Sequence, residues 1–243
     1  MNRFNITLIF ILLLLPSIAS AYMPSQRLGA LEFRFGPHRP NSNEIIVNDP
    51  ELSYENIFGK NESMFRFEIE LDWQFARVPD IISFAVGGTI GYMHEKGKAL
   101  YADPATGDMV KSSDTTTLNV FPMSLLAIIR VDVLKDKLGV PFSPYFKAGL
   151  DWDIWWTKTS GTTDNQGGTP GFRMVPGIAL SLNWIDLTTS RTFDNEVGVN
   201  NSALFFEYIY ERVDGFGDSG KLDLSPSNIK AHGTWMAGLL LEF

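Results

Sequence analysis

"MFRFEIELDWQ", residues 64–74, alternates apolar and polar side chains without interruption. Successive side chains of a β-strand point to opposite faces, so this stretch forms a strand with one apolar face and one charged face. At the spacing of an α-helix the two sets would mix, which excludes an amphipathic helix. The apolar members are Phe65, Phe67, Ile69, Leu71 and Trp73, and the polar members are Arg66, Glu68, Glu70, Asp72 and Gln74.

The same two-residue period recurs along the chain in segments of 9 to 14 residues. A tilted strand needs about 9–11 residues to cross a bilayer, whereas strands of soluble proteins usually have about 5–6. An even number of such segments is typical of bacterial membrane barrels. We therefore predict an all-β fold, a closed eight-stranded antiparallel up-and-down transmembrane β-barrel. The predicted strands are 28–36, 64–74, 82–93, 117–130, 144–156, 172–183, 203–212 and 231–243.

The connections between these strands differ in length. An even strand count places both termini on one side, the periplasmic side, so that four connections face outward and three face inward. The outward connections are longer on average, and 184–202 has room for a short helix. The Gly-rich stretch 159–171 is typical of a mobile loop. The predicted outward loops are 37–63, 94–116, 157–171 and 213–230, and the inward connections are 75–81, 131–143 and 184–202.

Two prolines conflict with this assignment. Pro122 and Pro176 fall inside the fourth and sixth strands, and a closed barrel has no free edge for a residue that lacks an N–H. A β-bulge at each position would accommodate them. The apolar period of the fourth strand also changes near Pro122, which leaves its inward and outward faces unassigned.

The beginning of the chain has the pattern of a secretory signal peptide. Arg3 precedes the apolar run "TLIFILLLLPSIAS", which is followed by small residues up to Ala21. The run is too short for a transmembrane helix, which needs about 20 apolar residues, and Pro16 interrupts it. We predict a signal peptide at 1–21 and a barrel domain at 22–243. The chain has no cysteine, and its net charge of -8 argues against nucleic acid as a partner.

Charged side chains occupy the predicted inward faces of the strands. An eight-stranded barrel leaves room for little besides side chains, which favours a packed polar network in the lumen. The alternative is a narrow ion path or ligand slot, in which the excess of acids over bases would favour cations. The predicted interior network contains Glu32, Arg34, Arg66, Glu68, Glu70, Asp72, Lys147, Asp151, Asp153, Arg173, Glu207 and Glu211, with Glu242 on the last strand.

Aromatic residues near the predicted strand ends suit the membrane interfaces, where a ring with a polar tip lies at the headgroup level. The alternative is that they form the core of a soluble, secreted β-sandwich. These residues are Tyr92, Trp152, Trp155, Trp156, Tyr208, Tyr210, Trp235 and Phe243.

The chain ends on "TWMAGLLLEF", residues 234–243, in which Trp235, Ala237, Leu239, Leu241 and Phe243 share one strand face. With the strand pattern, this ending resembles the small outer-membrane β-barrel proteins of the OmpA, OmpX and OmpW type. "LEFRFGPHRP" (31–40), "DTTTLNVFP" (114–122) and "PFSPYFKAGL" (141–150) look like a myxobacterial-type family of such barrels. The resemblance implies a location in the cell outer membrane of a Gram-negative bacterium. It also implies that the barrel-assembly machinery reads Trp235, Leu239, Leu241 and Phe243 as an assembly signal.

Catalytic and metal-binding chemistry is weakly represented. His38, His94 and His232 would all lie near the outer rim, as in lipid A modifying enzymes, but no spacing links them to a serine and an acid. We predict no catalytic residues, no metal and no cofactor. The preferred interpretation is a structural or surface-interaction role through four outward loops, with outer-membrane lipid and lipopolysaccharide as partners and the external ligand unknown. The alternatives are a porin-like narrow pore, a transporter of small hydrophobic molecules, and a lipid A modifying enzyme.

Overall fold

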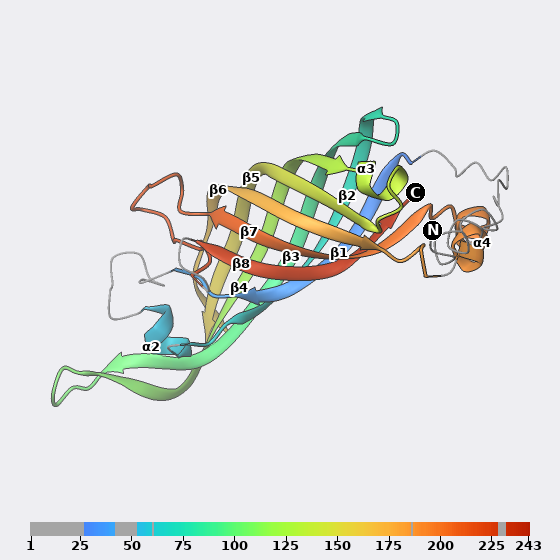
Figure 1. Ribbon diagram of the computed structural model, residues 1–243. Helices are drawn as coiled ribbons and strands as arrows, with labels where there is room; N and C mark the ends of the chain where they lie inside the picture. The colour runs from blue at the N-terminus through green and yellow to red at the C-terminus, as the bar shows by residue number, and fades with distance from the viewer. Residues whose placement is uncertain (1–26, 42–52, 60, 186, 228–231) are drawn as a thin grey trace, which may run out of the picture.

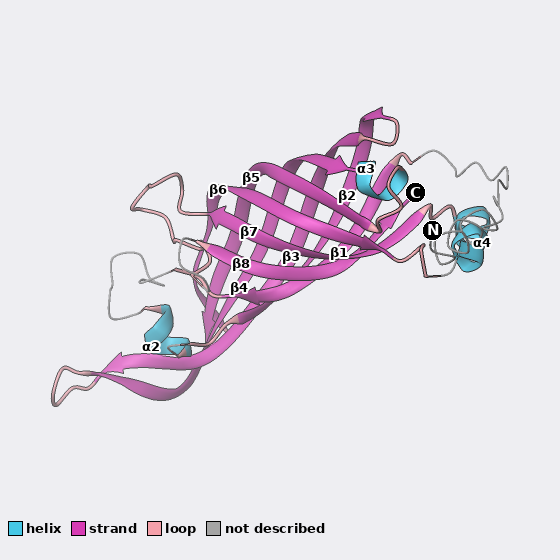
Figure 2. Cartoon of the chain, in the orientation of Figure 1, coloured by secondary structure: helices cyan, strands magenta, loops and turns pink. Residues whose placement is uncertain are grey.

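The chain forms a closed barrel of eight strands in sequence order, as the computed structural model shows (Figures 1 and 2). The structure describes residues 27–41, 53–59, 61–185, 187–227 and 232–243, so that the predicted signal peptide lies outside the described residues. The strands are β1 (Gly29–His38), β2 (Met64–Val78), β3 (Ile82–Ala102), β4 (Met109–Val131), β5 (Phe142–Thr159), β6 (Thr162–Ser181), β7 (Asn201–Arg212) and β8 (Gly233–Glu242). The helices are α2 (Tyr54–Phe58), α3 (Val133–Asp136) and α4 (Leu187–Val197).

Pairing of the first strand with the last closes the sheet. Phe33 lies opposite Ile69 of β2 on one side and opposite Leu239 of β8 on the other. Every strand is antiparallel to both of its neighbours, so that no strand edge is left open along the wall. The predicted fold class and all eight predicted strands are confirmed, with shifted ends.

The two ends of the barrel differ. The C-terminus, α3 and α4 lie at one end, which we call the inward end (Figure 1). Helix α2 and the long β3–β4 hairpin lie at the opposite, outward end (Figure 1). Helix α4 confirms the helix predicted within 184–202. No helix in the described ranges is long and apolar enough to cross a membrane.

Two of the predicted outward loops are instead strand. Segment 94–116 is largely a hairpin, because β3 continues to Ala102 and β4 begins at Met109. Segment 157–171 is another, in which Ser160 and Gly161 form the turn with φ values of 50° and 89°. The prediction of a mobile loop at 159–171 is therefore wrong. Strand pairing continues past the apolar band because backbone hydrogen bonds do not require apolar side chains. The predicted strands ended earlier because they were defined by the alternation of apolar and polar residues.

The predicted bulges at the two prolines are also wrong. At Pro122 the ladder from β4 to β5 continues, while the ladder to β3 lapses for two positions and resumes in the same register. At Pro176 the ladder from β6 to β7 lapses in the same way. Each proline lacks the one N–H that its lapsed ladder would use, so no extra residue is needed. Register shifts occur elsewhere, between Gln74 and Ala76, Lys98 and Leu100, and Thr157 and Lys158.

Strand β4 keeps one phase throughout its length. Its even-numbered residues face inward, and Leu118, Val120, Leu126 and Ile128 are all buried. Between Leu125 and Ile129 both faces of β4 are apolar, because Leu126 and Ile128 point into the lumen while Leu125, Ala127 and Ile129 point away from it. This explains why the sequence alone did not distinguish the two faces.

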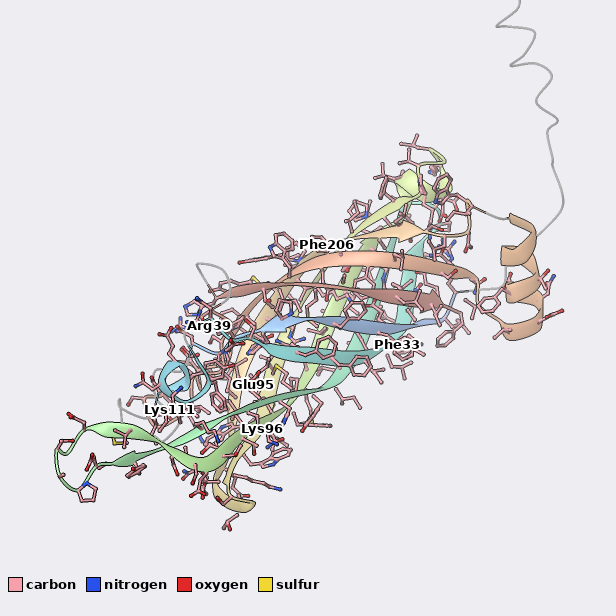
Figure 3. The ribbon with its side chains drawn as sticks, turned by 90° about the horizontal axis from the view of Figure 1, so that it is seen from below. Phe33, Arg39, Glu95, Lys96, Lys111 and Phe206 are labelled. Atoms are coloured by element: carbon pink, nitrogen blue, oxygen red, sulfur yellow. The ribbon has the colours of Figure 1, made fainter. Side chains whose placement is uncertain are left out.

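The outer face of the wall is apolar over a continuous band. Leu71, Leu125 and Leu150 are 60%, 62% and 61% exposed, and Phe33 and Phe206 lie on the outside of the wall (Figure 3). Charged residues of the same strands face the lumen. This polarity is the reverse of that of a soluble protein, and it suits a wall whose surrounding solvent is hydrocarbon.

Candidate functional site: the barrel interior and its outward mouth

The alternating strands place their charged side chains in the middle of the lumen. All twelve residues of the predicted interior network lie there, none more than 3% exposed, and Arg130 joins them. We call these thirteen residues the charged layer. Its members are Glu32, Arg34, Arg66, Glu68, Glu70, Asp72, Arg130, Lys147, Asp151, Asp153, Arg173, Glu207 and Glu211.

The inward half of the charged layer is organised around three cations. Lys147 Nζ lies 2.6 Å from a carboxylate oxygen of Glu32 and 2.6 Å from one of Glu70. Arg34 binds the same two carboxylates, at 2.8 Å for Glu32. Arg130 adds a contact to Glu32 at 2.8 Å. Each carboxylate is thus shared by more than one cation, which joins β1, β2, β4 and β5 across the lumen.

Three carboxylates in this half lie close enough together to hold a metal ion. Oxygens of Glu32, Glu70 and Asp72 lie within 4.8 Å of one another. Lys147 contacts the first two carboxylates, and Arg130 contacts Glu32 and Asp72. Because protein cations already neutralise these oxygens, the donor set does not call for a metal ion.

The outward half of the charged layer is built on two arginines. Arg66 lies 2.6 Å from Glu68 and 2.9 Å from Glu211. Arg173 lies 2.8 Å from Asp151, 3.1 Å from Glu68 and 3.3 Å from Glu211. Several donors of each planar guanidinium group are used, which suits arginine to this position better than lysine.

Asp153 is the exception in the charged layer. It is fully buried, and neither of its carboxylate oxygens has a hydrogen-bond partner among the described residues. A buried carboxylate without a partner is costly. Asp153 therefore belongs to the network by position and not by contact.

Arg130 is the interior residue that the sequence analysis missed. It is 3% exposed and binds Glu32 and Asp72. It continues the inward face of Leu126 and Ile128 two residues further on. The two-residue spacing after Ile128 indicates that Arg130 faces the lumen. This inference requires knowing which residues of β4 face the lumen.

An apolar plug fills the outward mouth above the charged layer. Tyr54, Ile57 and Phe58 come from α2, and Leu222 and Leu224 come from the β7–β8 connection. Burial raises the pKa of the Tyr54 hydroxyl above its usual range. The wall contributes Met64, Met93, Leu118, Val120 and Trp155, and Val213 follows directly after β7. We call these eleven residues the apolar plug.

Trp155 corrects one prediction. It was expected at a membrane interface, but it is 6% exposed, faces the lumen and belongs to the plug. Its Nε1–H donates to Thr169 Oγ1 at 3.3 Å. Its neighbours Trp152 and Trp156 lie on the opposite face of β5, because adjacent strand residues alternate.

The three histidines are engaged by different groups. His38, expected at the start of a loop, is instead the last residue of β1 and is fully buried. Its ring nitrogens lie 3.2 Å from an Arg66 nitrogen and 3.0 Å from the Leu224 carbonyl oxygen. His94 contacts Asn119 at 3.0 Å, and His232 packs on the ring of Tyr210. This arrangement offers no shared reaction centre.

The inward end of the lumen is also closely packed. Tyr145, Phe205 and Leu240 form an apolar cluster with two alanines, and the Tyr145 hydroxyl donates to Glu207 at 2.9 Å. A cavity of only about 10 Å³ lies beside Arg130, about the minimum that holds one water molecule.

The last strand presents its predicted assembly residues outward. Trp235 and Phe243 are 45% and 41% exposed, and Leu239 and Leu241 are half-buried on the same face. The Phe243 carbonyl oxygen accepts hydrogen bonds from the backbone N–H of Leu28, at 2.7 Å, and of Gly29. The end of the chain is therefore tied to the start of the first strand.

Together these features define the class of structure, a closed β-barrel with an apolar exterior and a packed interior. No known protein family and no curated protein sequence matches the chain. Among solved structures, it is similar to Neisserial surface protein A (15% identity, 88% of this chain and 97% of that one, TM-score 0.47). OprG from Pseudomonas aeruginosa is also similar (12% identity, 90% and 97%, TM-score 0.48), as is Ail of Yersinia pestis (10% identity, 91% and 100%, TM-score 0.42).

Proposed function

We propose that this protein is an integral outer-membrane β-barrel in which the interior is structural and the outward end is an interaction surface. The observation that carries the proposal is the reversed polarity of the wall. Large apolar side chains such as Leu71 and Leu150 are exposed outward, while the residues of the charged layer are buried inside. In water this exterior would aggregate, whereas in a bilayer it is the solvated side.

The packed lumen favours a structural role over a pore. The charged layer crosses the barrel through shared ion pairs, and the apolar plug covers it at the outward end. An ion would have to displace both. The accessible elements at the outward end include, in the described part of the chain, the exposed residues of α2, the β3–β4 hairpin and the β5–β6 hairpin, which are therefore the proposed surface for external partners.

The first experiment tests insertion and conduction together. The mature chain is refolded into liposomes, and its migration in SDS gels is compared with and without boiling. We expect a heat-dependent shift in migration, resistance to extraction by urea, and no conductance above background in planar bilayers. A soluble mature chain without a heat-dependent shift would favour a secreted sandwich, and steady conductance would favour the pore.

The outward face of β8 supports a role for the chain end in assembly. Deleting Phe243 is expected to reduce the yield of folded barrel in cells, whereas Phe243→Tyr keeps an aromatic ring there and retains the yield. The measurement is the heat-modifiable fraction in isolated outer membranes. A normal yield after deletion would contradict the proposed assembly signal.

A further inference from the structure

A row of cationic side chains crosses three neighbouring strands on the outer face of the barrel. Lys96 of β3 lies opposite Thr117 of β4, which in turn lies opposite Lys158 of β5. Lys98 lies opposite Thr115, one step further outward. The side chains at all these positions point away from the lumen. We call Lys96, Lys98 and Lys158 the lysine row; Figure 3 shows Lys96 on the hairpin, at the end away from Phe33.

The lysine row is not neutralised by the protein. None of its three ammonium groups lies within 4.0 Å of a carboxylate in the described part of the chain. Lys98 Nζ donates only to the Ser113 carbonyl oxygen, at 3.1 Å. By contrast, Arg212 on β7 is paired with Asp214 at 2.6 Å. The lysine row is therefore a positive patch available to an external anion.

The position of the lysine row relative to the membrane follows from the register. The next row inward consists of His94, Asn119 and Trp156, with Tyr92 beside it. The Tyr92 hydroxyl donates to Asn119 at 2.8 Å. Aromatic residues with polar partners mark the headgroup level of a bilayer. The lysine row thus lies one step outward of this level, where lipid phosphates are found.

An apolar groove lies nearer the inward end of the barrel than the lysine row does, and the two features overlap on β4 and β5. Its volume is about 430 Å³, and it crosses the outer face from β4 over β5 to β6. Trp152 lies four residues inward of Trp156 on β5, about 13 Å along the strand. This distance keeps the groove within the outward leaflet. Its apolar lining includes Met123, Leu125, Leu150, Trp152, Pro170 and Phe216, the last from the β7–β8 connection.

We infer that the lysine row and the groove together form a binding site for a phosphorylated, acylated lipid of the outward leaflet. The phosphate would contact Lys96, Lys98 and Lys158, and an acyl chain would lie in the groove between Trp152 and Phe216. The positive charge of the lysine row selects a phosphate group. The groove lies further toward the inward end of β5, so the acyl chain points from the phosphate into the membrane. A soluble phosphate would use the lysines alone and leave the groove without a role. The inference rests on the proposed membrane location.

The test uses the refolded full-length barrel in detergent, with bisphosphorylated lipid A as the probe and native mass spectrometry as the measurement. Lys96→Gln/Lys158→Gln is expected to weaken binding about 30-fold, since each lysine near a headgroup contributes about a factor of five. Lys137→Gln/Lys221→Gln is the matched control, because both lysines are exposed and lie outside the row. Equal affinity of the two double variants would overturn the lysine part of the site.

The groove is tested separately. Phe216→Ala removes an exposed ring from its rim, and we expect weaker binding of bisphosphorylated lipid A with no change in the weak binding of inorganic phosphate. Unchanged lipid affinity would overturn the acyl-chain part. Dephosphorylated lipid A should bind the native barrel as weakly as the lysine variant binds the phosphorylated form.

The outcome is separable from that of the proposed function. A barrel that shows heat-dependent migration and resists urea extraction, but does not prefer phosphorylated lipid, overturns this inference alone. A chain that does not insert overturns the proposed location as well.

Discussion

The charged layer and the apolar plug fill the same lumen by opposite means. In the charged layer Arg34 and Lys147 both bind Glu32 and Glu70, so that ion pairs connect several strands across the lumen. In the plug, apolar residues of α2 and of the β7–β8 connection pack against apolar residues of the wall. The strands therefore supply only part of the plug. The middle of the barrel is therefore held by the wall, whereas the mouth is held by connections.

The largest effect is expected from breaking the charged layer. Arg34→Met removes the cation shared by Glu32 and Glu70 and leaves buried carboxylates under-paired. We expect a loss of about 3–5 kcal/mol in the free energy of unfolding. The measurement is guanidinium unfolding in lipid vesicles, followed by tryptophan fluorescence. Arg212→Met is the control, since that pair is exposed and should change the free energy of unfolding far less. Equal losses would contradict the distinct role of the layer.

Breaking the plug should have a more local effect. Leu224 is fully buried in the connection that covers the mouth. Leu224→Ala is expected to make opening of α2 easier by about 2 kcal/mol, because a cavity replaces its contacts. Hydrogen exchange at 53–59 measures this opening, and Leu138→Ala, at an exposed site, is the control. If Leu224→Ala lowered the free energy of global unfolding as much as Arg34→Met does, the mouth and the middle would unfold as one unit.

Asp153 and Asp151 differ within the charged layer. Asp153 has no hydrogen-bond partner among the described residues, whereas Asp151, two residues away on β5, is bound by Arg173 at 2.8 Å. Asp153→Asn is expected to stabilise the barrel by about 1 kcal/mol, since it replaces a carboxyl group that has no partner for its ionised form with a neutral amide. Asp151→Asn should destabilise it, because Arg173 loses a partner. The same unfolding measurement applies, and a destabilised Asp153→Asn would show that this carboxylate has a partner after all.

The same contrast explains what the sequence could predict. Strict alternation in 64–74 predicts both the strand and the charged lumen, because one face is apolar and the other is charged. Where both faces are apolar, as around Leu126 and Ile128 on β4 and around Trp155 on β5, alternation carries no information, and Arg130 and the inward position of Trp155 were missed. The hairpins beyond the apolar band were missed for the opposite reason, since polar residues predominate on both of their faces.

The apolar plug and the lysine row, which join residues far apart in the sequence, could not be predicted. The plug joins α2 to Leu222 and Leu224 through the closed ring, and no local period relates these segments. The lysine row depends on register across three strands, and a shift of one residue on β5 would turn Lys158 toward the lumen.

The smallest effect is expected where the plug depends on a single hydrogen bond. Ser53 caps α2, and its Oγ accepts the backbone N–H of Asn56 at 3.3 Å. Ser53→Ala should make α2 open more readily by about 0.5–1 kcal/mol and leave global unfolding unchanged. Ser53→Asp keeps a capping oxygen and should retain the protection of 53–59 from hydrogen exchange. Because a helix of five residues has little stability of its own, its order comes from Tyr54, Ile57 and Phe58 in the plug. If Ser53→Ala released the helix completely, the cap and not the apolar contacts would hold the mouth closed.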